Sequence, residues 1–302
     1  MRQLRFMACI VLLFFGCQQK NMVSGGIIPK NFDWQGHRGA RGLMPENTIP
    51  AFLKALEYTV KTLELDVAIT KDSQVLISHD PLLSHSICSN PDGSPVTEAQ
   101  EKSLSVFQLT YAQIQQYDCG SRGNPNFPNQ QALKVSKPLL RDMIDAVEVY
   151  CKKNHRTLPI YNIEIKSRPA WDGVYTPLIE AYVRLVIAEI KNAHIQKRVC
   201  VQSFDVRALQ AVRKIAPDIR LALLIENKES FDRNMDQLGF TPSAYSPYYG
   251  LVDPALVTAV HDRNMRLIPW TVNDTTTMQK LIQLGVDGII TDYPNFILQV
   301  EK

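Results

Sequence analysis

Short apolar runs alternate along the chain with longer stretches in which apolar residues recur every three or four positions. The short runs predict buried strands, and the longer stretches predict amphipathic helices. The runs that qualify as strands are Phe32–His37, Leu63–Ala68, Ile160–Ile165, Val199–Gln202, Leu221–Ile225, Ala244–Ser246, Leu267–Val272 and Gly288–Thr291. The helical stretches are Thr48–Tyr58, Leu139–Lys153, Pro177–Asn192, Val206–Ala216, Asp253–Asn264 and Thr275–Leu284. This alternation is typical of a parallel sheet with crossover helices, so we predict an α/β fold of the (β/α)8 TIM-like barrel type.

One further apolar run, Val75–Ser78, interrupts the alternation. It follows the second strand after only a few residues, whereas a parallel crossover needs about a dozen or more. We therefore predict that it folds back as a β-hairpin, with Lys71–Gln74 as its turn. If Thr70 faces Val75, Asp66 lies opposite His79. At the first barrel helix, Asn47 is expected to cap the free N–H groups.

The segment 81–138 lies between the second and third barrel strands and is rich in Ser, Gly, Asn, Pro and Gln. We predict an insertion that covers one end of the barrel, because long structured loops are commonly functional. Only Leu104–Tyr117 has a helical pattern, which disfavours a separate second domain. Export would permit a disulfide between Cys88 and Cys119, although the sequence alone does not establish one.

The N-terminus has the pattern of a secretory signal. Arg2 and Arg5 precede the apolar run Phe6–Phe15, which at about ten residues is too short to span a bilayer of about 30 Å. The run 13–17, Leu-Phe-Phe-Gly-Cys, resembles a bacterial lipobox, although Phe14 stands where leucine is usual. The alternative is a plain secretory signal that is cut elsewhere.

We therefore predict three regions. Residues 1–16 form a lipoprotein signal peptide, residues 17–30 form a tether that begins with the lipidated Cys17, and residues 31–302 form the barrel domain. The protein is then expected to be exported and anchored to a membrane through its lipid, on the periplasmic or cell-surface side.

Composition narrows the function. The 302 residues suit one barrel of about 250 residues. The net charge of +3 is scattered, so the sequence does not indicate a nucleic-acid partner. The cysteines show no CxxC spacing, which argues against a zinc site. Neither composition nor pattern indicates an oligomeric state.

Ionisable residues gather at the ends of the predicted strands. Glu64 and Asp66 share one side of the second strand, and Glu164 lies on the third. Carboxylates on buried strands are costly unless they are paired or bind a metal, and three of them suit Ca²⁺ or Mg²⁺. Histidines at two strand ends can act as general acid and base, and nearby cations can bind a phosphate. The residues concerned are His37, His79, Arg38 and Lys166.

Several motifs together resemble the glycerophosphodiester phosphodiesterase family. They are His37-Arg38-Gly39-Ala40, Pro45-Glu46-Asn47-Thr48, Glu64-Leu65-Asp66-Val67, Ser78-His79-Asp80, Asn162-Ile163-Glu164-Ile165-Lys166, Gln202-Ser203-Phe204-Asp205, Trp270-Thr271-Val272-Asn273 and the run 285–294, Gly-Val-Asp-Gly-Ile-Ile-Thr-Asp-Tyr-Pro. The resemblance covers about residues 33–296, nearly all of the predicted mature chain.

The resemblance implies hydrolysis of glycerophosphodiesters to sn-glycerol 3-phosphate and an alcohol. It implies that His37 and His79 are the acid–base pair. It further implies that the metal ligands are Glu64, Asp66 and Glu164 and that Arg38 and Lys166 contact the phosphate. Glu46 resembles the glutamate that supports the first loop of the substrate site, and Trp270 resembles the aromatic wall that packs on the glycerol moiety. By contrast, Trp34 and Trp171 are expected to be packing or surface residues.

Two other functions remain open. The same barrel could act on lysophospholipids or on glycerophosphoinositol, depending on the shape of the insertion. A noncatalytic lipoprotein that binds phosphate esters is the other alternative, and the presence of both histidines and all three carboxylates disfavours it.

Overall fold

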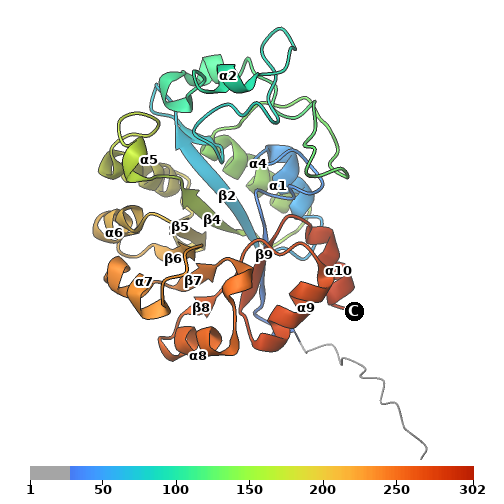
Figure 1. Cartoon of the computed structure of the whole chain (residues 1–302). Helices are drawn as coiled ribbons and strands as arrows, with labels where there is room; N and C mark the ends of the chain where they lie inside the picture. Colours follow the sequence, from blue (N-terminus) through green and yellow to red (C-terminus); the bar gives the residue numbers. More distant parts are fainter. Residues whose placement is uncertain (1–27) are drawn as a thin grey trace, which may run out of the picture.

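The computed structural model describes residues 28–302, which form a nearly closed barrel surrounded by helices (Figure 1). The barrel has eight parallel strands in the order β8-β7-β6-β5-β4-β2-β1-β9. They are β1 (Asp33–Gly36), β2 (Thr62–Ile69), β4 (Ile160–Ile165), β5 (Val199–Ser203), β6 (Arg220–Ile225), β7 (Ala244–Pro247), β8 (Arg266–Leu267) and β9 (Gly288–Thr291). Single backbone hydrogen bonds, such as Asp287 N to Leu267 O at 2.9 Å, join β9 to β8. The predicted signal peptide, Cys17 and residues 17–27 of the tether lie outside the described residues.

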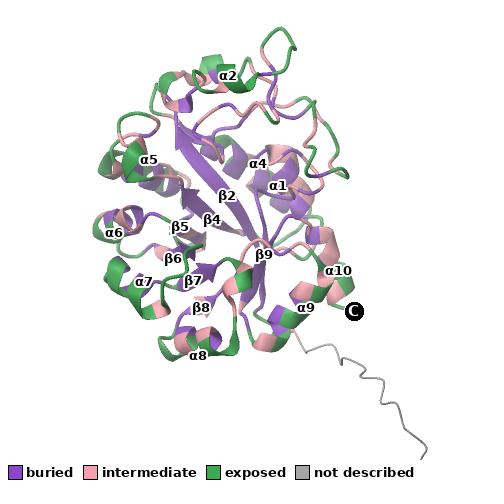
Figure 2. Ribbon diagram, viewed as in Figure 1, coloured by how far each residue is buried: buried purple, intermediate pink, exposed green. Residues whose placement is uncertain are grey.

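Helices surround the barrel and bury their inner faces against it (Figure 2). They are α1 (Ile49–Ala55), α4 (Leu140–Lys153), α5 (Ile179–Asn192), α6 (Val206–Ile215), α7 (Phe231–Leu238), α8 (Pro254–Asp262), α9 (Thr275–Leu284) and α10 (Ile297–Val300). Their continuous apolar stripes and the strands form one core. Within residues 28–302, no helix is both long and apolar enough to cross a bilayer.

Three local predictions about strands and helices were wrong. Of the predicted strand Leu267–Val272 only Leu267 belongs to a regular strand, β8; beyond it single hydrogen bonds, such as Trp270 N to Pro247 O at 3.1 Å, continue the pairing, and Pro269 has no N–H to add to them. The stretch Leu104–Tyr117 is not one helix, since Thr110 caps a separate short helix, α3 (Tyr111–Ile114), after a 3-10 turn. At α1 the N-cap is Thr48, whose hydroxyl accepts from Ala51 N, and Asn47 is free for another role.

The strand β3 (Val75–Ile77) runs antiparallel to β2, so the chain folds back after the second barrel strand. The register differs by one residue from the prediction, because Ile69, not Thr70, faces Val75. The Thr70 hydroxyl accepts a hydrogen bond from Gln74 N at 2.9 Å. Thr70 is therefore part of the turn and does not pair with Val75 in the ladder. Asp66 O therefore accepts from Ser78 N, and His79 lies one position further along.

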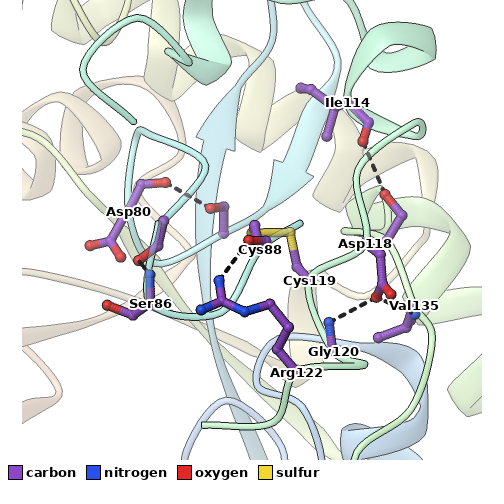
Figure 3. Close-up of a disulfide and its surroundings, with 12 residues drawn as sticks. Asp80, Ser86, Cys88, Ile114, Asp118, Cys119, Gly120, Arg122 and Val135 are labelled. Carbon is purple, nitrogen blue, oxygen red and sulfur yellow. Dashed lines mark hydrogen bonds between the residues drawn. A yellow bond between two sulfur atoms is a disulfide. The ribbon is translucent and has the colours of Figure 1, made fainter. Parts of the chain in front are cut away.

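The segment 81–138 packs on this hairpin with a small apolar cluster of its own. Cys88 and Cys119 form a disulfide in that cluster (Figure 3). Arg122 donates to Cys88 O, and Asp118 accepts from the backbone N–H groups of Gly120 and Val135. The segment includes α2 (Glu98–Glu101) as well as α3, and it has a buried apolar side despite its polar composition.

Candidate functional site

A cleft of about 950 Å³ opens at the carboxyl ends of the barrel strands, where barrels of this type place their active sites. The predicted catalytic pair His37 and His79 both line it. Of the other predicted residues, the following also line it: Arg38, Glu64, Glu164, Lys166 and Trp270. Asp66 and Glu46 do not line the cleft themselves but contact Arg38, which does.

The three predicted metal ligands lie together. One carboxylate oxygen from each of Glu64, Asp66 and Glu164 falls within 4.8 Å of the others, and all three residues are buried. Parallel pairing of β2 with β4 sets Asp66 directly beside Glu164. Because side chains two apart on a strand share a face, Glu64 joins them from β2.

Few cations compensate these carboxylates. Lys166 Nζ lies 2.8 Å from Glu164 and 3.2 Å from Asp66, and Arg38 Nε lies 3.4 Å from Asp66. Glu64 accepts hydrogen bonds from Arg38 N and Gln202 Nε2, both at 2.9 Å, and its nearest ionisable partner is the His37 ring at 3.9 Å. The cluster is therefore short of positive charge.

The pKa values reflect that shortage. Burial raises the pKa of Glu64 well above its usual value, and the Asp66 and Glu164 carboxylates raise it further. Burial also raises the pKa of Glu164 to about 7, despite Lys166. Burial alone would raise the pKa of Asp66, but Lys166 and other positive neighbours outweigh this effect and hold the pKa well below its usual range. The Oδ1 atom of Asp66 is buried and has no well-aligned hydrogen bond from a described residue, although the Lys166 ammonium lies 3.2 Å from it. A buried, oxygen-only donor set that is short of positive charge fits a divalent cation of the Ca²⁺ or Mg²⁺ kind.

His37 is oriented by a carboxylate that the sequence analysis quoted but did not assign. Its Nδ1 lies 2.7 Å from Asp292 Oδ1, and Arg41 binds the same carboxylate through Nε at 2.7 Å and a terminal nitrogen at 2.9 Å. Burial alone would raise the pKa of Asp292, but His37 and Arg41 outweigh this effect and hold the pKa far below its usual range. Burial lowers the pKa of His37 to about 4. The neutral ring therefore donates from Nδ1, which leaves Nε2 with a free lone pair.

His79 stands at the end of the hairpin, with 30% of its side chain exposed and Nδ1 2.9 Å from Asp80 Oδ1. Near Asp80 and Glu46 lies Lys137, a residue of the insertion that is only 5% exposed and that the sequence analysis did not single out. Burial lowers the pKa of Lys137, while Glu46 and Asp80 oppose this shift. Nothing in the sequence distinguishes a buried lysine in a polar loop from an exposed one, so the position of Lys137 could not be predicted.

Glu46, which the resemblance implied to support the first loop, contacts two arginines of the loop after β1. Its Oε1 accepts from an Arg38 terminal nitrogen at 2.8 Å, and Arg41 lies 3.7 Å from its other oxygen. Against burial, the two arginines lower the pKa of Glu46. Asn47, expected as a helix cap, instead donates to Asp66 Oδ2 at 2.8 Å, so the loop after β1 orients both Arg38 and a metal-ligand candidate.

Aromatic side chains form one wall of the cleft. The Trp270 ring meets Phe204 edge-on at 5.3 Å between centroids, and its Nε1 donates to Ser246 O at 2.9 Å. Phe204 is 40% exposed, which is high for a phenylalanine beside a polar site. Trp171 also lines the cleft, with the Arg168 guanidinium 4.1 Å from its ring centre, whereas Trp34 is buried in the core. The expectation for Trp34 is confirmed, and Trp171 contributes to the site region.

A chain of buried amides connects Glu64 to the opposite end of the barrel. Gln202 Nε2 donates to Glu64, and Gln35 Nε2 donates to Asp33 at 3.0 Å. Both glutamine carbonyls then accept from Asn162 Nδ2, each at 2.9 Å. An ionised carboxylate can only accept hydrogen bonds, so each glutamine must point its NH2 group at its carboxylate. The side-chain carbonyls of the two glutamines then point toward each other, and only a group with two N–H donors can bridge them. Asn162 supplies that donor.

Replacing Asn162 by aspartate should disturb the metal cluster without changing the side-chain size. One glutamine would have to turn away from its carboxylate, and an unmade buried hydrogen bond costs about 1–3 kcal/mol. We expect weaker binding of the divalent cation, by roughly 10- to 100-fold, and a lower melting temperature. Calorimetric titration with the cation checks this. The exposed Asn264→Asp protein is the control, and equal affinity in both variants would refute the proposed role of the amide chain.

Comparisons with known proteins agree with this geometry. Residues 37–296 match the glycerophosphoryl diester phosphodiesterase family. A glycerophosphodiester phosphodiesterase of Caldanaerobacter subterraneus subsp. tengcongensis is 30% identical over 269 residues, which are 88% of this chain and 96% of that protein. A solved structure from Silicibacter pomeroyi, assigned to the same activity, has a TM-score of 0.80 at 30% identity and covers 90% of this chain and 94% of its own. An Oleispira antarctica phosphodiesterase, solved in complex with its product sn-glycerol 3-phosphate, shares the fold with a TM-score of 0.70 at 21% identity, over 90% of this chain and 96% of its own.

Proposed function

The chain belongs to the glycerophosphodiester phosphodiesterase family, and we propose that it hydrolyses glycerophosphodiesters to sn-glycerol 3-phosphate and an alcohol. The observation that carries the proposal is a buried carboxylate triad, of which Glu64 and Glu164 line the cleft, next to two histidines and Arg38 in the same cleft. An anionic phosphodiester suits a cleft whose carboxylates are neutralised by a divalent cation.

Glu64, Asp66 and Glu164 would hold Ca²⁺ or Mg²⁺. When bound, the cation would neutralise charge on the phosphate group as the transition state forms. The choice between the two ions is open, because both prefer oxygen ligands. The side chains of Arg38 and Lys166 line the cleft beside the triad and would contact the phosphate oxygens.

The two histidines differ in environment, and this supports different roles. His37 is buried and neutral, with Nδ1 held by Asp292, so its Nε2 is suited to accept a proton from the attacking hydroxyl group. His79 is partly exposed at the cleft edge and would donate a proton to the leaving alcohol. The attacking group is either water, which gives glycerol 3-phosphate directly, or the free hydroxyl of the glycerol, which expels the alcohol and gives a cyclic phosphate that water then opens.

Trp270 and Phe204 would pack against the glycerol portion of the substrate. A second groove, of about 400 Å³, continues from Phe204 along Val206 and Leu224. Its apolar residues favour one alternative substrate class, lysophospholipids, whose acyl chain could lie there.

A substrate panel tests the proposed class. We expect glycerophosphocholine, glycerophosphoethanolamine and glycerophosphoinositol to be hydrolysed with glycerol 3-phosphate as the common product, identified by mass spectrometry. A lysophosphatidylcholine serves as the comparison. Turnover of the lysolipid alone would move the protein to the alternative class, and turnover of none of the four would contradict both.

We also propose that the mature protein is anchored to a membrane through a lipid on Cys17, which follows from the lipobox-like run 13–17. Cys17→Ser should then release the protein from the membrane fraction or block its maturation. Fractionation of cells that express the parent and the variant checks this outcome. Identical processing and partition of the two proteins would show that Cys17 is not the anchor.

A further inference from the structure

Basic residues gather at the barrel end opposite the cleft, where the strands begin. Because the barrel strands are parallel, all their first residues meet at this edge. Six exposed lysines belong to the junctions before β1, β2, β4 and β5, which are neighbours in the sheet. We call them the basic rim: Lys30, Lys61, Lys152, Lys153, Lys191 and Lys197.

Hydrogen bonds between successive junctions show that the rim is continuous. Lys61 Nζ donates to Lys30 O at 2.9 Å, and Arg156, which follows Lys153, donates to Leu56 O in the junction before β2. Arg198 donates to Pro159 O at 3.0 Å and so links the junctions before β5 and β4. The lysines therefore lie along one surface.

The positive charge of the rim is not neutralised locally. Among residues 28–302, none of the six ammonium groups has a carboxylate within 4.0 Å. Glu148 is engaged by Arg198, and Glu301, near Lys30 and Lys61, accepts a hydrogen bond from Trp34. Glu57, in the junction before β2, pairs with Lys54. On the other half of the same edge acidic and basic residues are mixed, with Asp218, Asp262 and Asp287 beside Lys214 and Arg263.

Helix dipoles explain only part of this pattern. Cations are favourable in the last turn of a helix, which accounts for Lys152, Lys153 and Lys191. Helix dipoles do not account for Lys30, Lys61 and Lys197, which lie outside α-helices, and α7 and α9 have no basic residue in their last turns.

The overall charge of the protein does not explain the basic rim either. Of the 33 basic residues of the chain, Arg2, Arg5 and Lys20 precede residue 28, so the described part has as many acidic as basic residues.

The chain enters the domain at this rim. Ile28 packs against the core, and Lys30 lies two residues after it. Only residues 17–27 separate the predicted lipid anchor from the described structure, and an extended segment of that length spans at most about 40 Å. A lipid on Cys17 would thus keep the rim close to the bilayer surface. Leu158, 37% exposed two residues after Arg156, adds an apolar side chain to the same face.

We propose that the basic rim docks the barrel on an anionic phospholipid surface. Lysine ammonium groups are attracted by anionic head groups over about a Debye length, which is about 10 Å at 0.1 M salt. The cleft lies at the far end of the barrel and would face the aqueous phase, where soluble glycerophosphodiesters diffuse freely. Docking in this orientation turns the cleft away from lysolipids in the same bilayer.

Lysine footprinting on the full-length mature protein tests the docking surface. The protein is mixed with vesicles of phosphatidylcholine alone or with added phosphatidylglycerol, and acetylation is read by mass spectrometry. We expect several-fold protection of the rim lysines with phosphatidylglycerol, none without it, and loss of protection at about 1 M salt, where the Debye length is about 3 Å. Four exposed lysines away from the rim are the internal reference: Lys71, Lys102, Lys228 and Lys280.

Matched charge reversals separate docking from general charge. Lys152, Lys153, Lys191 and Lys197 changed together to Glu should abolish protection of Lys30 and Lys61. The same change at the four reference lysines should preserve it. Both variants should hydrolyse a soluble substrate at the parental rate, so failure of the proposed activity and failure of docking are distinguishable. Uniform labelling with every vesicle would overturn the proposal, and so would stronger protection by DNA than by phosphatidylglycerol vesicles.

Discussion

Removing divalent cations with a chelator should abolish hydrolysis, and Ca²⁺ or Mg²⁺ should restore it. Glu64, Asp66 and Glu164 place their oxygens within 4.8 Å of one another in a buried cluster that Lys166 and Arg38 neutralise only in part. Without a cation, burial and repulsion from Asp66 and Glu164 raise the pKa of Glu64, which reflects the shortage of positive charge that a bound metal would supply. Activity measured before and after chelation gives the result.

A binding measurement makes the test independent of turnover. Glu64→Gln, Asp66→Asn and Glu164→Gln should each weaken binding of the cation in a calorimetric titration, because each removes one anionic ligand. Glu57→Gln is the matched control, since Glu57 lies at the surface and pairs with Lys54. Full activity in excess chelator, or unchanged affinity in all three cluster variants, would show that the triad is not the metal site.

Replacement of His37 or His79 by asparagine should lower kcat by about 10²–10⁴-fold, the usual contribution of a general acid or base. KM should change little, because each imidazole acts mainly in the transition state. The double variant should lose less than the product of the two single losses, since the pair acts as a unit. Steady-state kinetics with glycerophosphocholine measure these factors.

His155→Asn is the matched control for these variants. His155 is exposed, lies outside the cleft and has φ of +51°, a conformation that asparagine tolerates. It should keep parental kinetics. A folded His79→Asn protein with near-parental kcat would mean that His79 only caps the hairpin beside Asp80, and would remove it from the mechanism.

The pH dependence should differ from that of free imidazoles. Burial lowers the pKa of His37 to about 4, so its neutral, proton-accepting form persists well below the usual histidine value of about 6.5. The limb of the pH–rate profile that reports His37 should therefore lie on the acid side of that value, and activity should fall as pH decreases through it.

Much of the barrel could be predicted from sequence because burial controls its pattern. The strand β4 and the helix α9 have the predicted bounds, since a continuous apolar run and an amphipathic stripe define them. The hairpin register was wrong by one residue because a side-chain hydrogen bond of Thr70 closes the turn, which hydrophobic pattern does not encode. The helix α7 was missed because it is only eight residues long, so its apolar stripe of Phe231, Met235 and Leu238 covers about two turns.

The sequence indicated the residues that the candidate site brings together, but not the hydrogen bonds that connect them. His37 and Asp292 lie 255 positions apart, so only the closed barrel brings them to 2.7 Å. Asn162 and Gln202 lie on otherwise apolar strands, and a polar residue in such a run can be noticed in the sequence. The direction of their hydrogen bonds, however, depends on Glu64 and Asp33, the carboxylates at the two ends of the row of buried amides. Long-range pairing of this kind requires the three-dimensional structure.

The most direct test of the central claim is identification of the bond that is broken in glycerophosphocholine. The protein with Mg²⁺ or Ca²⁺ is incubated with this substrate, and the products are separated and identified. Cleavage between phosphorus and the choline oxygen gives glycerol 3-phosphate and choline, which is the predicted result, and it should cease in excess chelator. Formation of glycerol and phosphocholine, or no turnover of any glycerophosphodiester with either metal, would contradict it.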